Sequence, residues 1–221
     1  MEQKRMTTYV IEELSCPKCG KKHSLRKYKT INVTEKAKMK KDILQNRVFQ
    51  FTCDHCNYMA PLTYNSLYVD REKKLMIYMA PAMTEEVKQE LQCFSREEGN
   101  MTRRLVDNIN DLKEKIMIAD NGLDDRMIEV IKIMYLNQIK KEMEDDTLMD
   151  ILFDYSADQM CFLVFFQKKG IGKIPLTKEF YKGVEEKYRK AVEAVPMDSF
   201  ETVNMEWAGK IFFKKKDPFH S

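Results

Sequence analysis

Hydrophobic and polar residues alternate with a period of two over much of the first 80 residues and with a period near 3.6 over long stretches of the rest. The first period is typical of strands and the second of amphipathic helices. The change falls at Pro81, which predicts a module of residues 1–83 followed by a region of residues 84–221. Together they predict an α+β protein.

The first module is predicted to contain strands around two cysteine-containing turns, as in a zinc-ribbon-like β module. A short helix that ends at Leu44 separates the two turns, and a polar turn at residues 71–74 indicates a hairpin near the end of the module. Strands are predicted at residues 7–11, 25–33, 48–51, 66–70 and 75–79.

The second region is predicted to have central helices followed by a mixed α/β part, packed on the first module. Leu105, Ile109, Leu112 and Ile116 recur at helical spacing and predict one amphipathic helix. A second helix is predicted from about Asp124 to Met143. The remaining predicted elements are strands at residues 148–155, 160–167 and 172–176, a helix capped by Thr177 and a last strand at residues 209–215.

Two C-x-x-C pairs carry the strongest chemical signal in the chain. Two intervening residues let both thiolates of a pair point to one side of a tight turn, with backbone amides directed at the sulfurs. Two such turns that face each other form a tetrahedral thiolate site, and paired motifs are more specific for zinc than a single redox-type C-x-x-C. We therefore predict that Cys16, Cys19, Cys53 and Cys56 bind one structural Zn²⁺, which leaves no open coordination position for catalysis.

The other cysteines and the histidines are assigned no catalytic role. Cys93, on a predicted helix, and Cys161, inside the apolar run 160–166, are expected to be small buried residues. His55 is expected to face solvent, and His23 is a ligand only if a cysteine is displaced. Because no nucleophile, base and orienting residue occur in a recognisable arrangement, the sequence predicts no catalytic residue.

Acidic pairs at predicted helix boundaries invite a catalytic interpretation that the sequence does not favour. Asp124-Asp125 and Asp145-Asp146 stand where carboxylates cap helices and interact with the helix dipole. We expect them to serve as caps and dipole partners.

Composition places the chain among ordinary globular proteins, with 43% hydrophobic and 33% charged residues. The longest apolar run, at residues 160–166, is far shorter than a membrane span, and the N-terminus lacks the apolar core of a signal peptide. We expect a cytoplasmic protein that does not contact a membrane.

Charge is unevenly distributed along the chain. Residues 1–83 contain 16 basic and 8 acidic residues, whereas residues 84–221 contain 22 and 27. The basic half could attract a polyanion. However, lysines dominate it and few aromatic residues lie among them to stack on bases. Nucleic-acid binding is therefore an alternative that the sequence does not favour.

The cysteine turns and the segments around them resemble the CpXC family, a presumed domain of bacterial and archaeal proteins. The resemblance is carried by residues 16–20, 31–34, 49–53, 56, 61–62, 67–70 and 73–77. It extends strongly to about residue 80, and residues 120–129 look like a helical extension carried by similar proteins. The resemblance implies that the four cysteines bind zinc. It supplies no reaction, because the activity of the family is uncharacterised.

Three positions depart from the pattern of that family. Asp54 and Asn57 stand in the second cysteine turn where the family tends to have Pro and Gly, and Val69 stands where a His is common. All four cysteines are retained, so the implied metal site is intact.

The leading prediction is a non-enzymatic, zinc-stabilised binding or scaffold protein with an unknown protein partner. One alternative is a nucleic-acid-binding protein that uses the basic N-terminal half. The other is an enzyme with a pocket between the two parts, which would need ionisable groups that converge in a deep cavity.

Overall fold

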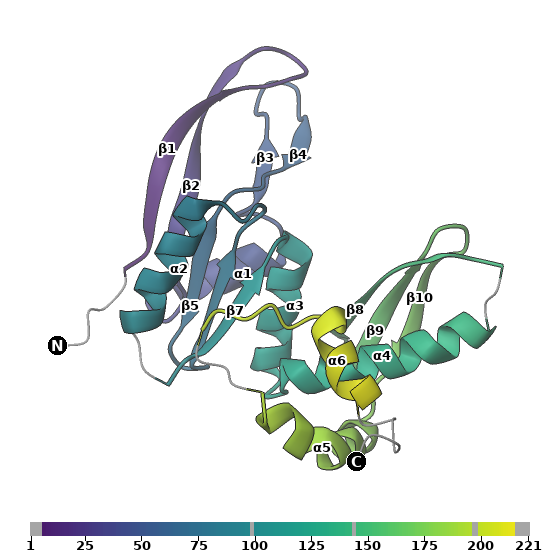
Figure 1. The fold of residues 1–221 in the computed structure, drawn as a ribbon. Helices are drawn as coiled ribbons and strands as arrows, with labels where there is room; N and C mark the ends of the chain where they lie inside the picture. Colours follow the sequence, from purple (N-terminus) through teal and green to yellow (C-terminus); the bar gives the residue numbers. More distant parts are fainter. Residues whose placement is uncertain (1–5, 98–99, 143–144, 196–198, 215–221) are drawn as a thin grey trace. The chain divides into compact units, whose positions relative to one another are not determined.

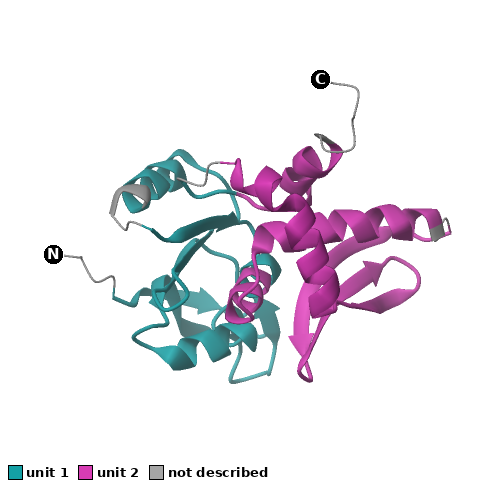
Figure 2. Ribbon diagram, turned by 90° about the horizontal axis from the view of Figure 1, so that it is seen from below, with its two compact units in different colours: residues 1–113, 197–201 teal, residues 114–196, 202–221 magenta. Residues whose placement is uncertain are grey.

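The computed structural model describes residues 6–97, 100–142, 145–195 and 199–214, and these form six helices and ten strands in three sheets (Figure 1). The predicted α+β class is confirmed. The chain divides into two compact units, residues 1–113 with 197–201 and residues 114–196 with 202–221 (Figure 2). Among the described residues, none of the helices is both long and apolar enough to cross a bilayer.

The five-stranded sheet of the first unit has the order β1-β2-β5-β6-β7. Neighbouring strands pair antiparallel for β1/β2 and β5/β6, and parallel for β2/β5 and β6/β7. Its strands are β1 (Thr8–Ser15), β2 (Lys22–Asn32), β5 (Ser66–Asp70), β6 (Leu75–Met79) and β7 (Thr102–Val106).

The hairpin of β5 and β6 lies at the centre of this sheet and has the predicted bounds. Every residue of both strands is buried. Strands covered on both faces are expected to be continuously apolar, which explains the runs of hydrophobic residues in this part of the sequence. The turn between them ends at Lys74, which takes a positive φ of 50°.

Helix α1 (Ala37–Leu44) follows β2 and is joined to the sheet by polar contacts. Asn32 Oδ1 accepts a hydrogen bond from the backbone N–H of Thr34 at 3.0 Å, which starts the turn that leads into the helix. Lys40 forms a 2.8 Å ion pair with Asp70, whose side chain is only 4% exposed. Lys40 belongs to the lysine-rich residues 21–47, the basic segment of the chain. One lysine of this segment therefore neutralises a buried carboxylate of the same unit.

The sequence placed a boundary at 83/84, whereas the compact units divide at 113/114, within α3 (Ile109–Asp120). Helix α2 (Glu85–Glu97) and β7 belong to the first unit because β7 pairs along its whole length with β6. Leu105, predicted to begin a helix, lies in β7, and its N–H donates to the carbonyl of Glu201 at 3.0 Å. The helical spacing from Leu105 to Ile109 therefore spans a strand and a helix.

The second unit packs helices on one face of a three-stranded antiparallel sheet of order β10-β9-β8. The three strands predicted between residues 148 and 176 are confirmed. The Thr177 cap is also confirmed, since Thr177 Oγ1 accepts a hydrogen bond from the N–H of Phe180 at 3.1 Å. Ile151 and Phe162 of the sheet join Ile128 and Val184 of two helices in one core. The elements are α4 (Asp125–Glu142), β8 (Leu148–Ser156), β9 (Gln159–Phe166), β10 (Gly170–Pro175), α5 (Lys178–Glu193) and α6 (Met205–Lys214). The predicted end of the second central helix at Met143 lies outside the described residues.

The last predicted strand, residues 209–215, is wrong: residues 205–214 form α6, and Lys215 lies outside the described residues. Asn204 Oδ1 accepts a hydrogen bond from the N–H of Trp207 at 3.0 Å, which caps the helix. Ala208, Ile211 and Phe212 lie on its buried face. Aromatic residues near the end of the sequence favoured a strand, but the cap and the spacing of the buried residues favour a helix.

Five charged residues are buried together in the second unit, each with 8% or less of its surface exposed. Lys115 lies 3.0 Å from Glu129 and 3.2 Å from Asp125, and it donates to the carbonyl of Val203. Lys132 lies 2.7 Å from Glu114 and 3.1 Å from Glu129. Asp125, predicted to be a helix-dipole partner, thus also belongs to a buried network.

The neighbours of this network keep its lysines charged. Burial lowers the pKa of Lys115, but the adjacent carboxylates of Glu129 and Asp125 outweigh burial and raise it above the ordinary lysine value. Glu114 also accepts a hydrogen bond from the N–H of Phe153, which ties the network to β8. A buried charge without its partner is costly, so these residues depend on one another.

We expect Lys132→Met to lower the free energy of unfolding of the protein by about 3–5 kcal/mol, because it leaves Glu114 and Glu129 buried with less compensating charge. Urea denaturation followed by circular dichroism measures the change. The control is Lys88→Met, which removes an exposed ion pair with Glu85 and should cost less than about 1 kcal/mol. Equal effects of the two substitutions would contradict the importance of the buried network.

Candidate metal centre

Each cysteine turn connects the two strands of an antiparallel hairpin in the first unit. Cys16 and Cys19 lie between β1 and β2, whereas Cys53 and Cys56 lie between β3 (Gln50–Thr52) and β4 (Met59–Pro61). Figure 1 shows β3 and β4 beside the far end of the long β1–β2 hairpin. The strands therefore bring together two turns that are distant in sequence.

The two turns have the same backbone design. The N–H of Gly20 donates to the carbonyl of Cys16 at 2.8 Å, and the N–H of Asn57 donates to the carbonyl of Cys53 at 2.9 Å. Gly20 has a φ of 71° and Asn57 a φ of 53°, so both lie in the left-handed region. Asparagine tolerates this region better than other residues with a Cβ, which explains how Asn57 stands where the family tends to have Gly.

The four thiols converge within a space that suits one metal ion. All four Sγ atoms lie within 4.8 Å of one another, with Cys16 and Cys56 3.7 Å apart and Cys19 and Cys53 3.6 Å apart. The four cysteines form no disulfides. A tetrahedral ion with metal–sulfur distances of about 2.3 Å has sulfur–sulfur edges of about 3.8 Å. The cluster can therefore hold a metal ion with four sulfur ligands.

Backbone amides direct positive ends of their dipoles at the sulfur atoms. Burial raises the pKa of the Cys16 thiol, but hydrogen bonds from the amides of Cys19 and Lys18 outweigh burial and lower the pKa to about 7. Amides of Cys56 and His55 likewise lower the pKa of Cys53 against the effect of burial. Each turn thus favours the thiolate form of its first cysteine.

The same site resists the ionisation of all four thiols unless a cation is present. Burial raises the pKa of Cys56 to about 12, and hydrogen bonds with the other three thiols act in the same direction, against the amide of Tyr58. Thiolates at these separations repel one another strongly. The donor set therefore fits a divalent ion, which compensates for part of this negative charge.

His23 lies next to the cluster, whereas from its position in the sequence a role is expected only on loss of a cysteine. The Nε2 atom of His23 is 3.2 Å from Cys53 Sγ. In the tautomer with its proton on Nε2, the imidazole donates a hydrogen bond to the thiolate of Cys53. Its ring packs edge-on against Phe51 at a centroid distance of 5.3 Å. The pairing of Leu14 with His23 in the β1–β2 hairpin places this ring near the second turn. The sequence spacing alone does not reveal that contact.

Other residues singled out by the sequence do not belong to the group of four clustered thiols. His55 is exposed and Cys161 is buried, both as predicted. Cys93 was expected to be buried but is exposed, because α2 buries Val87 and turns Cys93 away from the core. Val69, which replaces a His that is common in the family, is fully buried among apolar residues of the sheet. In this chain the side chain at position 69 therefore packs in the hydrophobic core of the sheet.

The basic segment is partly neutralised within its own unit. Besides Lys40 with Asp70, Arg47 pairs with Asp42 at 3.1 Å. Lys36, Lys38 and Lys41 of the same segment are exposed. The segment therefore presents fewer available cations than its sequence indicates.

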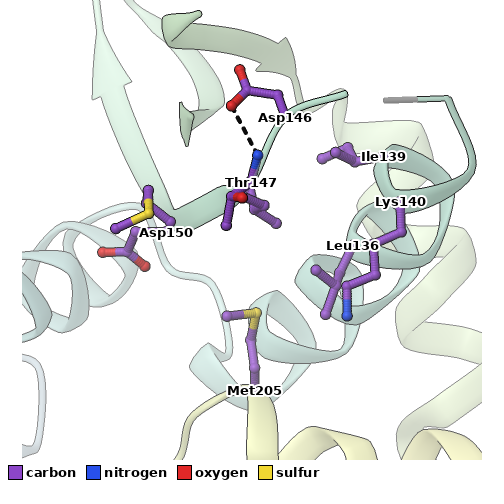
Figure 3. A pocket seen from close by; sticks show the side chains of 9 residues that line it. Leu136, Ile139, Lys140, Asp146, Thr147, Asp150 and Met205 are labelled. Carbon is purple, nitrogen blue, oxygen red and sulfur yellow. Dashed lines mark hydrogen bonds between the residues drawn. The ribbon is translucent and has the colours of Figure 1, made fainter. Parts of the chain in front are cut away.

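The second unit contains a cavity of about 470 Å³, lined by residues that include Lys140, Asp146 and Asp150 (Figure 3). Asp146 accepts hydrogen bonds from the backbone N–H groups of Thr147, Lys168 and Lys169, at 2.8–3.0 Å. These amides outweigh burial and lower the pKa of Asp146. The carboxylate stabilises the turn before β10 and not the first turn of a helix, so the prediction that Asp146 caps a helix is wrong.

We expect Asn57→Gly to preserve the second turn and Asn57→Val to destabilise it by about 1–3 kcal/mol, because a β-branched residue is strained at this φ. Urea unfolding and retained metal content measure the effect. His55→Val is the control, since His55 is exposed in the same turn and is not at a positive φ. Equal stability of Asn57→Val and His55→Val would contradict the proposed backbone requirement.

The comparisons with known proteins agree with the geometry of the cysteine turns. No curated protein and no solved structure matches the chain. The family model described as CpXC protein matches residues 14–132, which include all four cysteines and more than half of the chain. The chain therefore belongs to the CpXC protein family.

Proposed function

We propose that Cys16, Cys19, Cys53 and Cys56 bind one structural Zn²⁺ and that the chain is a non-enzymatic binding or scaffold protein. The observation that carries the metal assignment is the convergence of four Sγ atoms within 4.8 Å of one another. A donor set of four thiolates in a tetrahedral arrangement favours zinc or iron. Zinc is preferred because it is the usual ion in closed structural sites of paired C-x-x-C turns.

The surroundings of the cysteines support a structural role for the metal. Among the described residues, the local core has three buried members, Cys16, Phe51 and Cys53, and a few partly buried residues pack against them. Two of the three buried residues are proposed ligands. So small a core supplies little hydrophobic stabilisation. Metal binding in such sites contributes directly to the free energy of folding, and the ion takes the place of a larger apolar core.

A closed site of four cysteines leaves no coordination position for a water molecule or a substrate. A catalytic zinc site normally keeps one position open. The proposed role of the metal is therefore to hold the tips of the β1–β2 and β3–β4 hairpins together. These tips then form a rigid surface for a protein partner.

The first test measures metal in protein purified without added chelator. We expect one equivalent of zinc per chain, and removal of the zinc should lower the midpoint of thermal unfolding. Elemental analysis and calorimetry supply the two measurements. Stoichiometric iron in place of zinc, or a metal-free protein of equal stability, would contradict the assignment.

The second test removes one ligand. Cys53→Ser should abolish stoichiometric zinc binding and unfold the β3–β4 region. The three remaining thiolates bind the ion too weakly, and metal binding is coupled to folding in such sites. Cys93→Ser is a matched control, since Cys93 is an exposed cysteine outside the cluster. Retained zinc and an unchanged melting curve in Cys53→Ser would argue against the proposed ligand set.

The third test separates this proposal from nucleic-acid binding by the basic half. We expect only weak RNA or DNA binding, lost between low and physiological salt, because exposed lysines without stacking aromatics give a screened attraction. The informative variant changes Lys36, Lys38 and Lys41 to Glu and leaves Lys40, which pairs with Asp70, unchanged. The control changes the exposed Lys169, Lys173 and Lys182. Tight binding at physiological salt that only the first variant weakens would favour the nucleic-acid function.

A further inference from the structure

The second unit has a separate apolar groove between α5 and α6, with a volume of about 790 Å³. It lies outside the residues matched by the family model and has no residue in common with the cysteine cluster. Its lining comes from the last turn of α5, the two residues that follow this helix, and the middle of α6. The lining residues are Lys190, Ala191, Ala194, Val195, Trp207, Lys210 and Ile211.

The walls of the groove are suited to an apolar ligand. Ala191 and Ala194 are small, and they leave room on the α5 side. On the α6 side, Trp207 is half-buried and Ile211 is 8% exposed. Ligand sites are typically cavities of about 300–1,000 Å³ with mostly hydrophobic and aromatic walls and a few polar groups. The groove agrees with this description in both size and composition.

Among the described residues of the lining, both charged ones are lysines. Lys190 and Lys210 are exposed at the groove, and none of the described lining residues is acidic. Glu206 lies 3.2 Å from Lys210, but the two side chains are 79% and 68% exposed. An ion pair so open to water is weak, so Lys210 remains able to attract another anion. The electrostatics of the groove therefore favour a negatively charged ligand.

The charge of this groove distinguishes it from the other cavities described in the second unit. The cavity of Figure 3 contains Asp146 and Asp150 with one lysine. A cavity of about 720 Å³ beside the start of α5 has two lysines balanced by Asp158 and Glu185. Neither of these two cavities selects an anion by the charge of its lining.

The length of the groove favours a small molecule over a protein segment. Residues 190–193, the part of the lining segment that lies in α5, advance about 5 Å along that helix, and residues 207–211 advance about 6 Å along α6. An amphipathic helix that docks in a groove uses anchors at i, i+3, i+4 and i+7 and needs a contact of at least two turns. The lining is too short to seat such a set of anchors.

We propose that the groove between α5 and α6 binds a small organic carboxylate with an aliphatic or aromatic body. The carboxylate lies near Lys190 and Lys210, and the apolar body lies against Trp207, Ile211 and the two alanines. The carbonyl groups at the C-terminal end of α5 carry partial negative charge, so they disfavour a carboxylate placed beside Val195. This proposal does not depend on the metal at the cysteine cluster.

Trp207 is the only tryptophan of the chain, so its fluorescence reports directly on the groove. The full-length protein is titrated with decanoate, decanol and decyltrimethylammonium, each below its micellar concentration. We expect saturable binding of decanoate, weaker binding of decanol and the weakest binding of the cation. Octanoate should bind about tenfold more weakly than decanoate, since it is shorter by two methylenes and each buried methylene contributes about threefold to fourfold. Equal affinity for the three head groups would overturn the proposal.

Variants locate the ligand. Lys190→Gln and Lys210→Gln should each weaken decanoate binding about twofold to fivefold and leave decanol binding unchanged. Lys169→Gln is the control, because Lys169 is an exposed lysine of the same unit outside the groove. Ala194→Leu should fill the groove and weaken both ligands without loss of stability, since Ala194 is exposed. Decanoate binding that none of the three groove variants weakens would overturn the assignment.

A second copy of the chain is the remaining occupant to be tested. Sedimentation of the ligand-free protein over a range of concentrations measures self-association. We expect the fluorescence of Trp207 to be independent of protein concentration. A dimer whose formation shifts that fluorescence and competes with decanoate would assign the groove to a subunit contact instead.

Discussion

Four sulfur atoms held within a few ångströms of one another impose the strongest local constraint on the first unit. Thiolates in this arrangement repel one another, and little apolar surface lies around them to compensate. Two hairpins therefore meet at a point that is electrostatically unfavourable unless a cation is present. The backbone amides, the left-handed residues at Gly20 and Asn57 and the imidazole of His23 all serve this one arrangement.

The two units gain stability from different sources. In the first unit, the sheet has a conventional apolar centre at β5 and β6, while the cysteine turns extend beyond it with almost no core of their own. In the second unit, one large apolar cluster covers the sheet, and a buried set of ion pairs lies among its helices. Buried ion pairs seldom add net stability over apolar residues, but they penalise any packing that separates the partners.

The sequence revealed those features that depend on local pattern or on unusual residues. Paired cysteines have few alternative explanations, and the β5–β6 hairpin has strong strands around a polar turn. The start of α5 at Thr177 could also be predicted from the sequence. A capping residue and the helical spacing of the apolar residues after it both indicate a helix that begins there.

The features that the sequence did not reveal depend on contacts between distant residues. The identity of β7 depends on pairing with β6 and with Glu201, nearly 100 residues away, so Leu105 looked like the start of a helix. The proximity of His23 to Cys53 likewise requires two hairpins to meet. The buried network joins Lys115 to Val203 and Glu114 to Phe153, and a charged residue in a sequence gives no sign that it is buried.

The parallel pairing of β2 with β5 has a consequence for metal affinity. Residues 30–32 of β2 lie beside residues 67–69 of β5, so the chain between these strands must leave the sheet and return to it. The second cysteine turn lies within this excursion, which is therefore anchored at both ends by the sheet. Anchoring raises the effective concentration of one cysteine pair at the other. The affinity for the ion is thus set partly by the hydrogen bonds between strands that contain no ligand.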